Sequence, residues 1–347
     1  RPEVRERAFR LLEDVCKRYA VDGIELDFMR HLPHFSCNAA GDDCTQKERD
    51  IATELLRRVR HMTEQVGLER RRPLLVAVRL PASVPCCEAS GLDVTRWLQQ
   101  NLVDILVPGE WELSPWEEWV ALGHRHGVPV YPCLSWTGSK KRQGPPEVQS
   151  GLPLRNFRAR AMNIWHAGAD GVYTFNLFDP ASSAWRELGD PEVLEGLDKD
   201  YFPDGYWRIL MGRDFRDLHR FVERPTTLCP ERPVRLEPGR PCTVAMTIGE
   251  DPSERRHGPQ PGVALSVHTS GLKRADALAV RLNDHAVSNG SRTEGWVCYA
   301  VAAEWIRSGA NTIEITYSDP SGKAIDLNDV HLRITYPGEQ DTDRARP

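Results

Sequence analysis

The stretch that decides the fold is VDGIELDFMRH, residues 21–31, in which acidic and apolar side chains alternate. Side chains two apart on a β-strand point the same way, so Glu25 and Asp27 share one face and the apolar residues between them share the other. Removing an unpaired carboxylate from water is costly, so two on one strand need either partners or a reaction to perform. An ion pair with Arg30 or Arg79 is the alternative to a chemical role.

Short apolar strands alternate with amphipathic helices from residue 1 to about residue 220, a pattern typical of a parallel α/β architecture. The strands that we predict are 21–28, 74–80, 103–108, 128–134 and 170–176. Helix starts are also readable. Capping boxes are predicted at Thr45 to Glu48 and at Ser114 to Glu117, with Asp93 as the cap of a third helix.

Five such strands fit either an open doubly wound sheet or the later part of a (β/α)8 barrel. Two features favour the barrel: no glycine-rich phosphate-binding motif follows any strand, and polar or aromatic residues follow the strand ends, where barrel enzymes build their sites. These residues are Asp27, Arg30, His31, Arg79, Glu110, Trp111, Ser135, Trp136, Asn176 and Asp179.

The pattern changes at about residue 225, where strands of five to eight residues follow one another with turns between them. Such a series predicts an antiparallel β-sandwich. The predicted sandwich strands are 243–248, 263–269, 277–283, 296–302, 312–318 and 329–336. We therefore expect a partial barrel over 1–222, a linker over 223–241, a sandwich over 242–337 and a disordered tail over 338–347.

Charge and composition exclude some classes of partner. With 45 Lys and Arg against 50 Asp and Glu, the net charge is −5, which gives no overall attraction to nucleic acid, and no stretch is apolar enough to span a membrane. The chain opens on RPEVRERAFR, a helical pattern without a signal peptide. We expect the chain to be a fragment of a longer protein. Its cellular compartment is therefore left open, and a secreted or extracytoplasmic location is included. The oligomeric state is also left unassigned.

The loop after the first strand holds other reactive residues. Nine cysteines occur without a CxxC pair, and Cys37 and Cys44 fall in this one loop, as a local disulfide or as two free thiols. His31 and His34 could chelate a metal with nearby aspartates, or could be solvated loop residues. We predict no metal site and no cofactor.

Three segments resemble a known family. YAVDGIELDFMRH (19–31), preceded by PEVRERAFRLLEDV (2–15) and followed by GADGVYTFN (168–176), resembles the glycoside-hydrolase-like barrel proteins of bacteria that are grouped near the family 10 glycosidases. The resemblance covers roughly residues 1–220. It implies that strand 21–28 corresponds to the fourth barrel strand and that the first three strands are missing from this sequence.

The resemblance implies glycosidic chemistry, which usually needs two carboxyl groups. We assign the chemical role to Asp27 at the strand end, and a supporting role, buried and paired, to Glu25 one step deeper. Glycosidases of the family 10 kind carry a second catalytic Glu after the seventh strand, but VPVYPCLSW (128–136) ends without an acid. Glu110, after the sixth strand, is the nearest alternative, and a solvated loop acid is its other interpretation.

Further residues are candidates for substrate binding. Arg79 could hold Asp27 ionised or bind a substrate carboxylate, and we favour the ion pair. Trp111 and Trp136 follow two strand ends, where an aromatic face suits a sugar ring as well as core packing. The remaining predicted substrate-binding residues are Arg30, His31, Asn176 and Asp179.

We therefore predict a carbohydrate-active enzyme that cleaves glycosidic bonds, with a carbohydrate as its partner. The alternative is a non-catalytic carbohydrate-binding protein on a degenerate barrel, which the missing acid after the seventh strand favours. The sandwich would be a structural cover or a sugar-binding accessory module.

Overall fold

A computed structural model describes most of the chain, in two compact units. The described residues are 1–29, 31–109, 113–136, 143–203, 218–223, 226, 228–254, 259–320 and 322–337. The first unit comprises Arg1–Cys133, Ala169–Tyr173 and Ile209–Glu223, and the second comprises Leu134–Gly168, Thr174–Arg208 and Arg224–Pro347. Three of the predicted site residues, Arg30, Glu110 and Trp111, lie outside the described residues, as does the predicted tail.

The first unit is built on a parallel sheet in the order β1-β2-β3. Its strands are β1 (Gly23–Asp27), β2 (Leu75–Leu80) and β3 (Ile105–Pro108). The chain near residue 130 continues this sheet, because Leu106 and Val130 form a parallel bridge. The segment at 170–173 follows, since Asp170 N donates to Val130 O at 3.1 Å and Tyr173 N donates to Pro132 O at 3.0 Å. The five predicted strand positions of this half of the chain thus lie side by side in sequence order.

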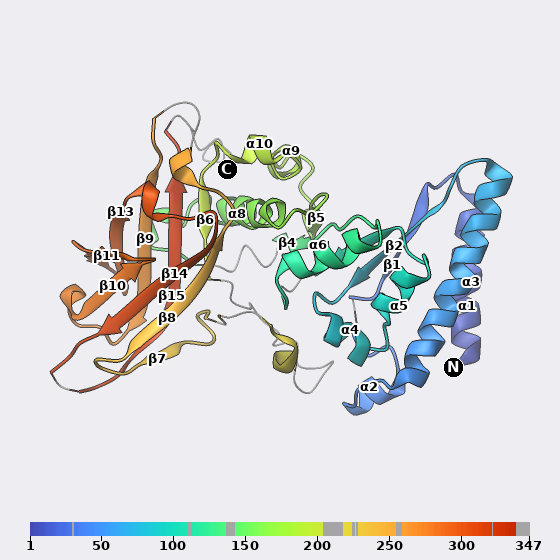
Figure 1. The fold of residues 1–347 in the computed structure, drawn as a ribbon, viewed down its shortest axis with the longest axis horizontal. Helices are drawn as coiled ribbons and strands as arrows, with labels where there is room; N and C mark the ends of the chain where they lie inside the picture. The colour runs from blue at the N-terminus through green and yellow to red at the C-terminus, as the bar shows by residue number, and fades with distance from the viewer. Residues whose placement is uncertain are drawn as a thin grey trace. The chain divides into compact units, whose positions relative to one another are not determined.

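Helices surround this sheet: α1 (Pro2–Arg18), α2 (Ser36–Ala40), α3 (Gln46–Arg70), α4 (Val84–Ala89), α5 (Val94–Gln99), α6 (Trp116–Arg125) and η2 (Leu218–Phe221). Figure 1 shows α1 and α3 running alongside each other, and the Arg58 to Glu6 ion pair of 2.8 Å joins them. The predicted caps of Thr45 and Asp93 are confirmed. The box at Ser114 is wrong, because α6 begins at Trp116 and the Ser114 hydroxyl hydrogen-bonds the Glu223 carboxylate instead.

β4 (Cys133–Ser135) and β5 (Tyr173–Phe175) pair with each other. The second unit continues through further helices and a short strand, and then enters a series of β-strands. The helices and the strand are η1 (Pro146–Val148), α8 (Leu152–His166), α9 (Ala184–Glu187), α10 (Pro191–Leu194) and β6 (Lys199–Tyr201).

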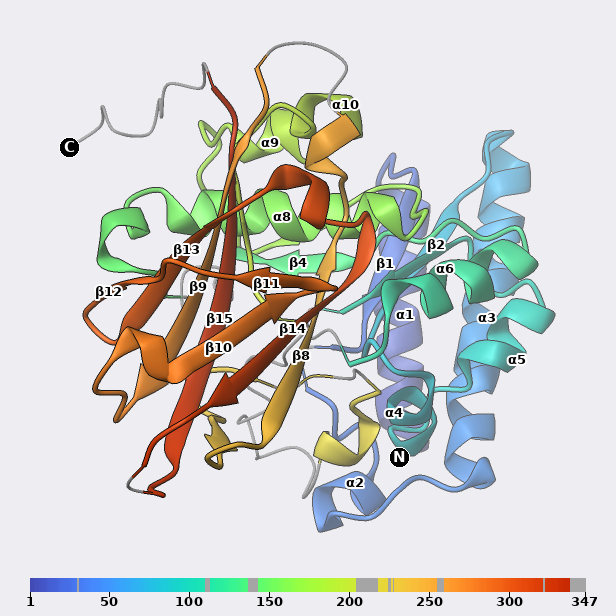
Figure 2. The ribbon, with the colours of Figure 1, turned by 60° about the vertical axis from the view of Figure 1, so that its left-hand side comes forward.

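Two antiparallel sheets form the rest of the second unit, in the orders β11-β10-β14-β8 and β12-β13-β9-β15-β6. Figure 2 shows β15 running the length of the second sheet, where it pairs with β9, β6 and β7. The elements are β7 (Val234–Leu236), β8 (Pro241–Ile248), η3 (Pro252–Glu254), β9 (Gly262–Ser270), η4 (Ala275–Ala277), β10 (Leu278–Leu282), β11 (His285–Val287), β12 (Ser291–Thr293), β13 (Trp296–Val301), η5 (Ala303–Trp305), β14 (Gly309–Tyr317) and β15 (Ile325–Thr335).

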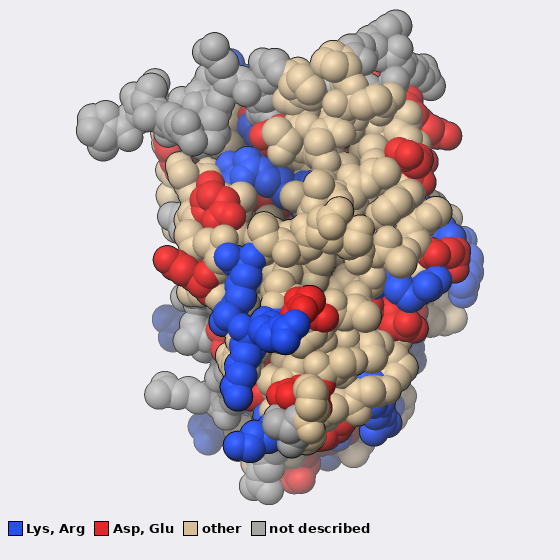
Figure 3. Space-filling view, turned by 90° about the vertical axis from the view of Figure 1, so that its left-hand side faces the viewer, with Lys and Arg blue, Asp and Glu red and all other residues tan. Residues whose placement is uncertain are grey.

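All six predicted sandwich strands are present, and alternate residues along them fill one apolar core. Four strands were not predicted, β6, β7, β11 and β12, each of three residues. β7 lies inside the predicted linker and pairs with β15. β6 precedes the predicted linker in sequence, and it also pairs with β15. On the face of the sandwich in Figure 3, basic and acidic side chains are interspersed, so that face has no field of a single sign.

A buried polar network ties α8 to the sandwich strands within the second unit. Arg155 Nε lies 2.6 Å from Asp200 Oδ2, and His331 Nε2 lies 2.7 Å from Asp200 Oδ1. Beside it, Glu250 accepts from Lys199 Nζ at 2.9 Å and also from two tyrosine hydroxyls.

Within the described residues, no helix combines the length and apolar character that crossing a membrane requires.

Candidate functional site

The two acids of the opening stretch lie together near the carboxyl end of β1. Parallel pairing with β2 requires close backbone approach, and Gly23 permits it, because a Cβ there would lie 2.4 Å from Leu75 O. Glu25 and Asp27 share one face of the strand, and their Cα atoms are about 6.6 Å apart at the usual rise of a β-strand. Both residues are exposed. Two carboxyl groups therefore meet solvent side by side.

Asp27 is held at both of its carboxylate oxygens. Its Oδ2 lies 3.0 Å from Nη1 of Arg79, whose side chain is only 2% exposed. Its Oδ1 accepts a 2.8 Å hydrogen bond from Met29 N. The register of the parallel strands places Asp27 directly opposite Arg79, so the ion pair follows from the pairing of β1 with β2. The favoured interpretation of Arg79, an ion pair with Asp27, agrees with this geometry.

Glu25 has a different environment. Its Oε1 accepts a 3.2 Å hydrogen bond from the Tyr173 hydroxyl, and no ion pair joins it to another described residue. Partial desolvation raises the pKa of Glu25, the neighbouring Asp27 carboxylate adds to the rise, and the Tyr173 hydrogen bond and Arg79 oppose it. The pKa of Tyr173 is raised to about 12, first by desolvation and then by Glu25. Glu25 is thus a carboxyl group biased towards its protonated form.

The expectation that Glu25 is the buried acid of the two is wrong, although it does have a hydrogen-bond partner. Its side chain is exposed, and its partner is a phenol instead of a cation. Sequence reasoning also missed Tyr173, although a signal was present. Tyr173 lies in a predicted strand of the same parallel architecture, so its hydroxyl was a candidate partner for a polar residue of another strand.

The histidines of the following loop differ from each other. His31 is exposed, whereas the ring of His34 lies edge-on to Phe28, with 5.5 Å between ring centroids. Burial lowers the pKa of His34, and its Nε2 is buried without a hydrogen-bond partner in the part of the chain that the structure describes. Among those residues, no group of three or more His, Cys, Asp or Glu is arranged to hold a metal ion.

The other predicted binding residues that the structure describes belong to the second unit. Trp136 is half-buried, and its ring packs against Phe157 with 5.2 Å between centroids. Asn176 has a left-handed backbone with φ 59° directly after β5. Asp179 Oδ1 accepts a hydrogen bond from Ala181 N at 2.9 Å, so it caps a turn. These contacts stabilise local structure, and the group that the first unit brings together is Glu25, Asp27, Arg79 and Tyr173.

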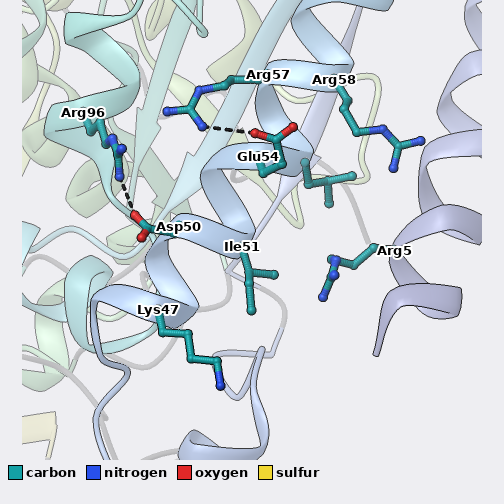
Figure 4. Close-up of a pocket in the computed structure, with 9 residues that line it drawn as sticks. Arg5, Lys47, Asp50, Ile51, Glu54, Arg57, Arg58 and Arg96 are labelled. Atoms are coloured by element: carbon teal, nitrogen blue, oxygen red, sulfur yellow. Dashed lines mark hydrogen bonds and ion pairs between the residues drawn. The ribbon is translucent and has the colours of Figure 1, made fainter.

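A groove of about 740 Å³ lies between helices of the first unit. Its lining comes from α1, α3 and α5, and Figure 4 shows Arg5 and Arg58 facing the groove from opposite helices. The acids in this lining are already paired, Asp50 with Arg96 at 2.5 Å and Glu54 with Arg57 at 3.1 Å. The groove therefore offers no carboxyl group with the character of Glu25.

Comparisons with known proteins give weak likenesses. No protein-family model matches the chain, and no curated protein sequence does. Among solved structures, it is similar to a β-porphyranase of glycoside hydrolase family 86 from the human gut bacterium Bacteroides plebeius, with 15% identity and a TM-score of 0.24 over 40% of this chain and 20% of that one.

Two chitinases are also similar. Chitinase ChiW from Paenibacillus sp. str. FPU-7 has 13% identity and a TM-score of 0.35, over 96% of this chain and 42% of that one. Chitinase ChiA74 from Bacillus thuringiensis has 11% identity and a TM-score of 0.36, over 95% of this chain and 76% of that one. The chain thus spans less than half the length of the porphyranase and of ChiW. TM-scores of 0.24 to 0.36 carry no argument about fold or reaction, which we base on the residues of this chain.

Proposed function

We propose that this chain is part of a carbohydrate-active enzyme that hydrolyses glycosidic bonds, with its site at the carboxyl end of β1. The observation that carries the proposal is the contrast between two neighbouring carboxyl groups. Glu25 has a raised pKa and is exposed, while Asp27 is held by a buried arginine. Glycosidases need one protonated and one ionised carboxyl group around the scissile bond, and environments that differ in this way supply such a pair.

In this proposal Glu25 donates its proton to the glycosidic oxygen as the bond to the anomeric carbon breaks. Asp27, held in place by its contact with Arg79, faces the developing positive charge of the sugar ring. The Tyr173 hydroxyl then stabilises the Glu25 carboxylate that proton donation leaves. The assignment exchanges the roles that the sequence suggested for the two acids. In addition to this pair, a base that activates water is required, and Glu110 stays the candidate for it.

The architecture that we propose is the later part of a (β/α)8-type barrel, because five strand positions lie side by side in sequence order with helices between them. A partial barrel over 1–222, a linker over 223–241 and an accessory sandwich over 242–337 remain our proposal for the domains. The sandwich would serve mainly as a structural cover, since its buried acid Glu250 is paired with Lys199.

The alternative is a protein that binds carbohydrate without cleaving it. Both oxygens of Asp27 are engaged, by Arg79 and by Met29 N, which is the observation that favours this alternative. A carboxylate held for structure would leave the site with one chemically available acid. Binding would then depend on exposed polar groups such as Glu25 and His31.

A hydrolysis assay separates the two functions. The full chain is incubated with a panel of poly- and oligosaccharides, and released reducing ends are measured for wild type, Glu25→Gln and Asp22→Asn. Asp22 is the matched control, because it is an exposed acid at the opposite end of the same strand. A general acid contributes roughly 10²- to 10⁴-fold to rate, so Glu25→Gln should lose that factor and Asp22→Asn should not. Glycan binding without any release of reducing ends would support the alternative.

A further inference from the structure

The loop after β1 holds two thiols in contact. Cys37 lies in α2, and Cys44 directly precedes Thr45, the N-cap of α3. Their Sγ atoms are 3.2 Å apart, although the residues are seven positions apart in the chain. A disulfide bond is about 2.05 Å long, so the two sulfurs need to approach by about 1.2 Å. Cys37 is half-buried, and Cys44 is 5% exposed.

One side chain fixes both ends of this loop. Asn38 is 2% exposed, and its Oδ1 accepts hydrogen bonds from Cys44 Sγ at 3.3 Å and from Phe35 N at 3.4 Å. Its Nδ2 donates to Ala89 O at 2.9 Å and to Asp42 O at 3.2 Å. The segments that carry Cys37 and Cys44 are therefore held together by a buried hydrogen-bonding centre.

The chain after α4 is shaped to receive the loop. Cys44 N donates to Ala89 O at 2.9 Å. Gly91 has φ +87°, and a Cβ at this position would lie 2.6 Å from the Phe35 ring and 3.1 Å from Cys44 Sγ. A side chain at Gly91 would push the loop away, so the glycine allows Cys44 to stay beside Cys37.

We propose that Cys37 and Cys44 form a disulfide that closes the loop following β1, with a low-molecular-weight or protein disulfide as the oxidant. The Cys37 thiolate attacks the oxidant, forms a mixed disulfide and expels one thiolate. The Cys44 thiolate then attacks Cys37 Sγ, forms the internal bond and expels the second thiolate. The two cysteines are oxidised, the oxidant is reduced to two thiols, and the two cysteine protons pass through solvent to the departing thiolates.

The order of these steps follows from exposure. Cys37 is the more accessible sulfur, so it meets the oxidant first. Burial raises the pKa of Cys44 to about 12, and the adjacent Cys37 adds to the rise. The second step is therefore slow near neutral pH, and its rate should increase about tenfold per pH unit as the thiolate fraction grows.

His31 and His34 lie between Asp27 and Cys37, so the disulfide would fix the end of the segment that carries them. The ring of His34 already packs on Phe28, the residue that follows Asp27, so a closed loop would hold this end of β1 in place. This inference does not depend on glycosidic chemistry.

The experiment uses the full chain, incubated with oxidised glutathione at pH 8, alkylated without denaturation and cut by a protease that cleaves before aspartate. Cleavage at Asp42 or Asp43 separates the two cysteines, so their peptides stay joined only through a disulfide. We expect the joined peptides in wild type and their loss in Cys37→Ser and in Cys44→Ser. Cys242→Ser is the matched control, because Cys242 is also half-buried but lies elsewhere in the chain, and it should behave as wild type.

A second measurement covers variants that fold poorly. In the chain-entropy model, closing a loop of this length with a disulfide lowers the equilibrium constant for unfolding roughly 50-fold. This corresponds to a rise in melting temperature on the order of 5 °C. Oxidised wild type should show this rise, and reduction should abolish it. Two alkylated cysteines after oxidation, glutathione that stays on Cys37 at pH 9, or a disulfide that forms only after denaturation would each overturn the proposal.

Discussion

Both units combine carboxylates with cations and phenols. The carboxylates of the two units differ in how exposed they are to water. In the second unit, Asp200 and Glu250 are 0% and 8% exposed. Asp200 bonds Arg155 and His331, and Glu250 accepts from Lys199 and two tyrosines. Each buried carboxylate thus has two or more strong partners, which is what a charge needs in order to leave water.

The two carboxyl groups of β1 in the first unit, Glu25 and Asp27, have fewer strong partners. Asp27 has Arg79, but Glu25 has one phenol, and both carboxyl groups remain exposed. Full burial with complete pairing thus supports folding, whereas exposure with incomplete pairing leaves a carboxyl group free to exchange protons with a ligand. The difference can be tested by neutralising one acid at a time and ranking the losses of stability.

The largest loss should come from Asp200→Asn. Neutralising this carboxylate removes the buried charge that Arg155 Nε and His331 Nε2 contact, which costs about 3–5 kcal/mol. Chemical denaturation of the second unit measures the loss. Asp326→Asn is the control, since Asp326 forms an exposed pair with Arg235 in the same sandwich and should change stability by less than about 1 kcal/mol. Equal losses in the two variants would remove the distinction between buried and exposed pairs.

Low pH should reduce the stability that Asp200 contributes. Burial raises the pKa of Asp200, but His331, Arg155 and Arg333 outweigh burial and hold the pKa below its usual value. A depressed folded pKa gives stability that is present above the unfolded pKa of about 3.9 and is lost as pH falls through the folded pKa. In melts from pH 7 to pH 2, the gap between wild type and Asp200→Asn should narrow below about pH 4. A gap that stays constant over this range would contradict the assignment.

Asp27→Asn should have an intermediate effect. It leaves the buried Arg79 without its carboxylate, but Asp27 is 36% exposed, so water can replace part of the lost interaction. We expect a loss of about 1–3 kcal/mol, smaller than that of Asp200→Asn. Denaturation of the first unit measures it. A loss as large as that of Asp200→Asn would show that Asp27 belongs with the buried structural group.

Sequence reasoning located the longer elements, because alternation over four or more residues reveals a strand. It also favoured the Asp27 to Arg79 ion pair, and the register of β1 with β2 places these two residues opposite each other. It missed β6, β7, β11 and β12, since three residues are too few to show alternation. Tyr173 was missed because its partner Glu25 is 148 positions away, and only the order of the strands brings them together.

Tyr173→Phe should have a small effect on stability, about 0.5–1.5 kcal/mol, because it removes one hydrogen bond at an exposed site. Its second effect is more informative. The hydroxyl lowers the pKa of Glu25, so its removal should raise that pKa further above the usual value. Titration of the Glu25 carboxyl carbon by NMR in wild type and variant measures the shift. An unchanged or lower pKa would show that the phenol does not bond the carboxylate in solution.

Glu25→Gln should change stability least, by no more than about 0.5 kcal/mol at pH 7, because the side chain is exposed and has no ion pair among the described residues. The sign of the change in stability is also informative. A raised folded pKa means that the fold favours the protonated acid, so stability from this group is present at low pH and is lost as pH rises through the folded pKa. The neutral amide should therefore be equal to wild type or slightly more stable at pH 7, and the difference should shrink as pH falls. Melts of both proteins from pH 4 to pH 8 measure it. A clear loss of stability at pH 7 would place Glu25 with the buried carboxylates, whereas a neutral or favourable change would mark it as an acid that the fold retains without needing its charge.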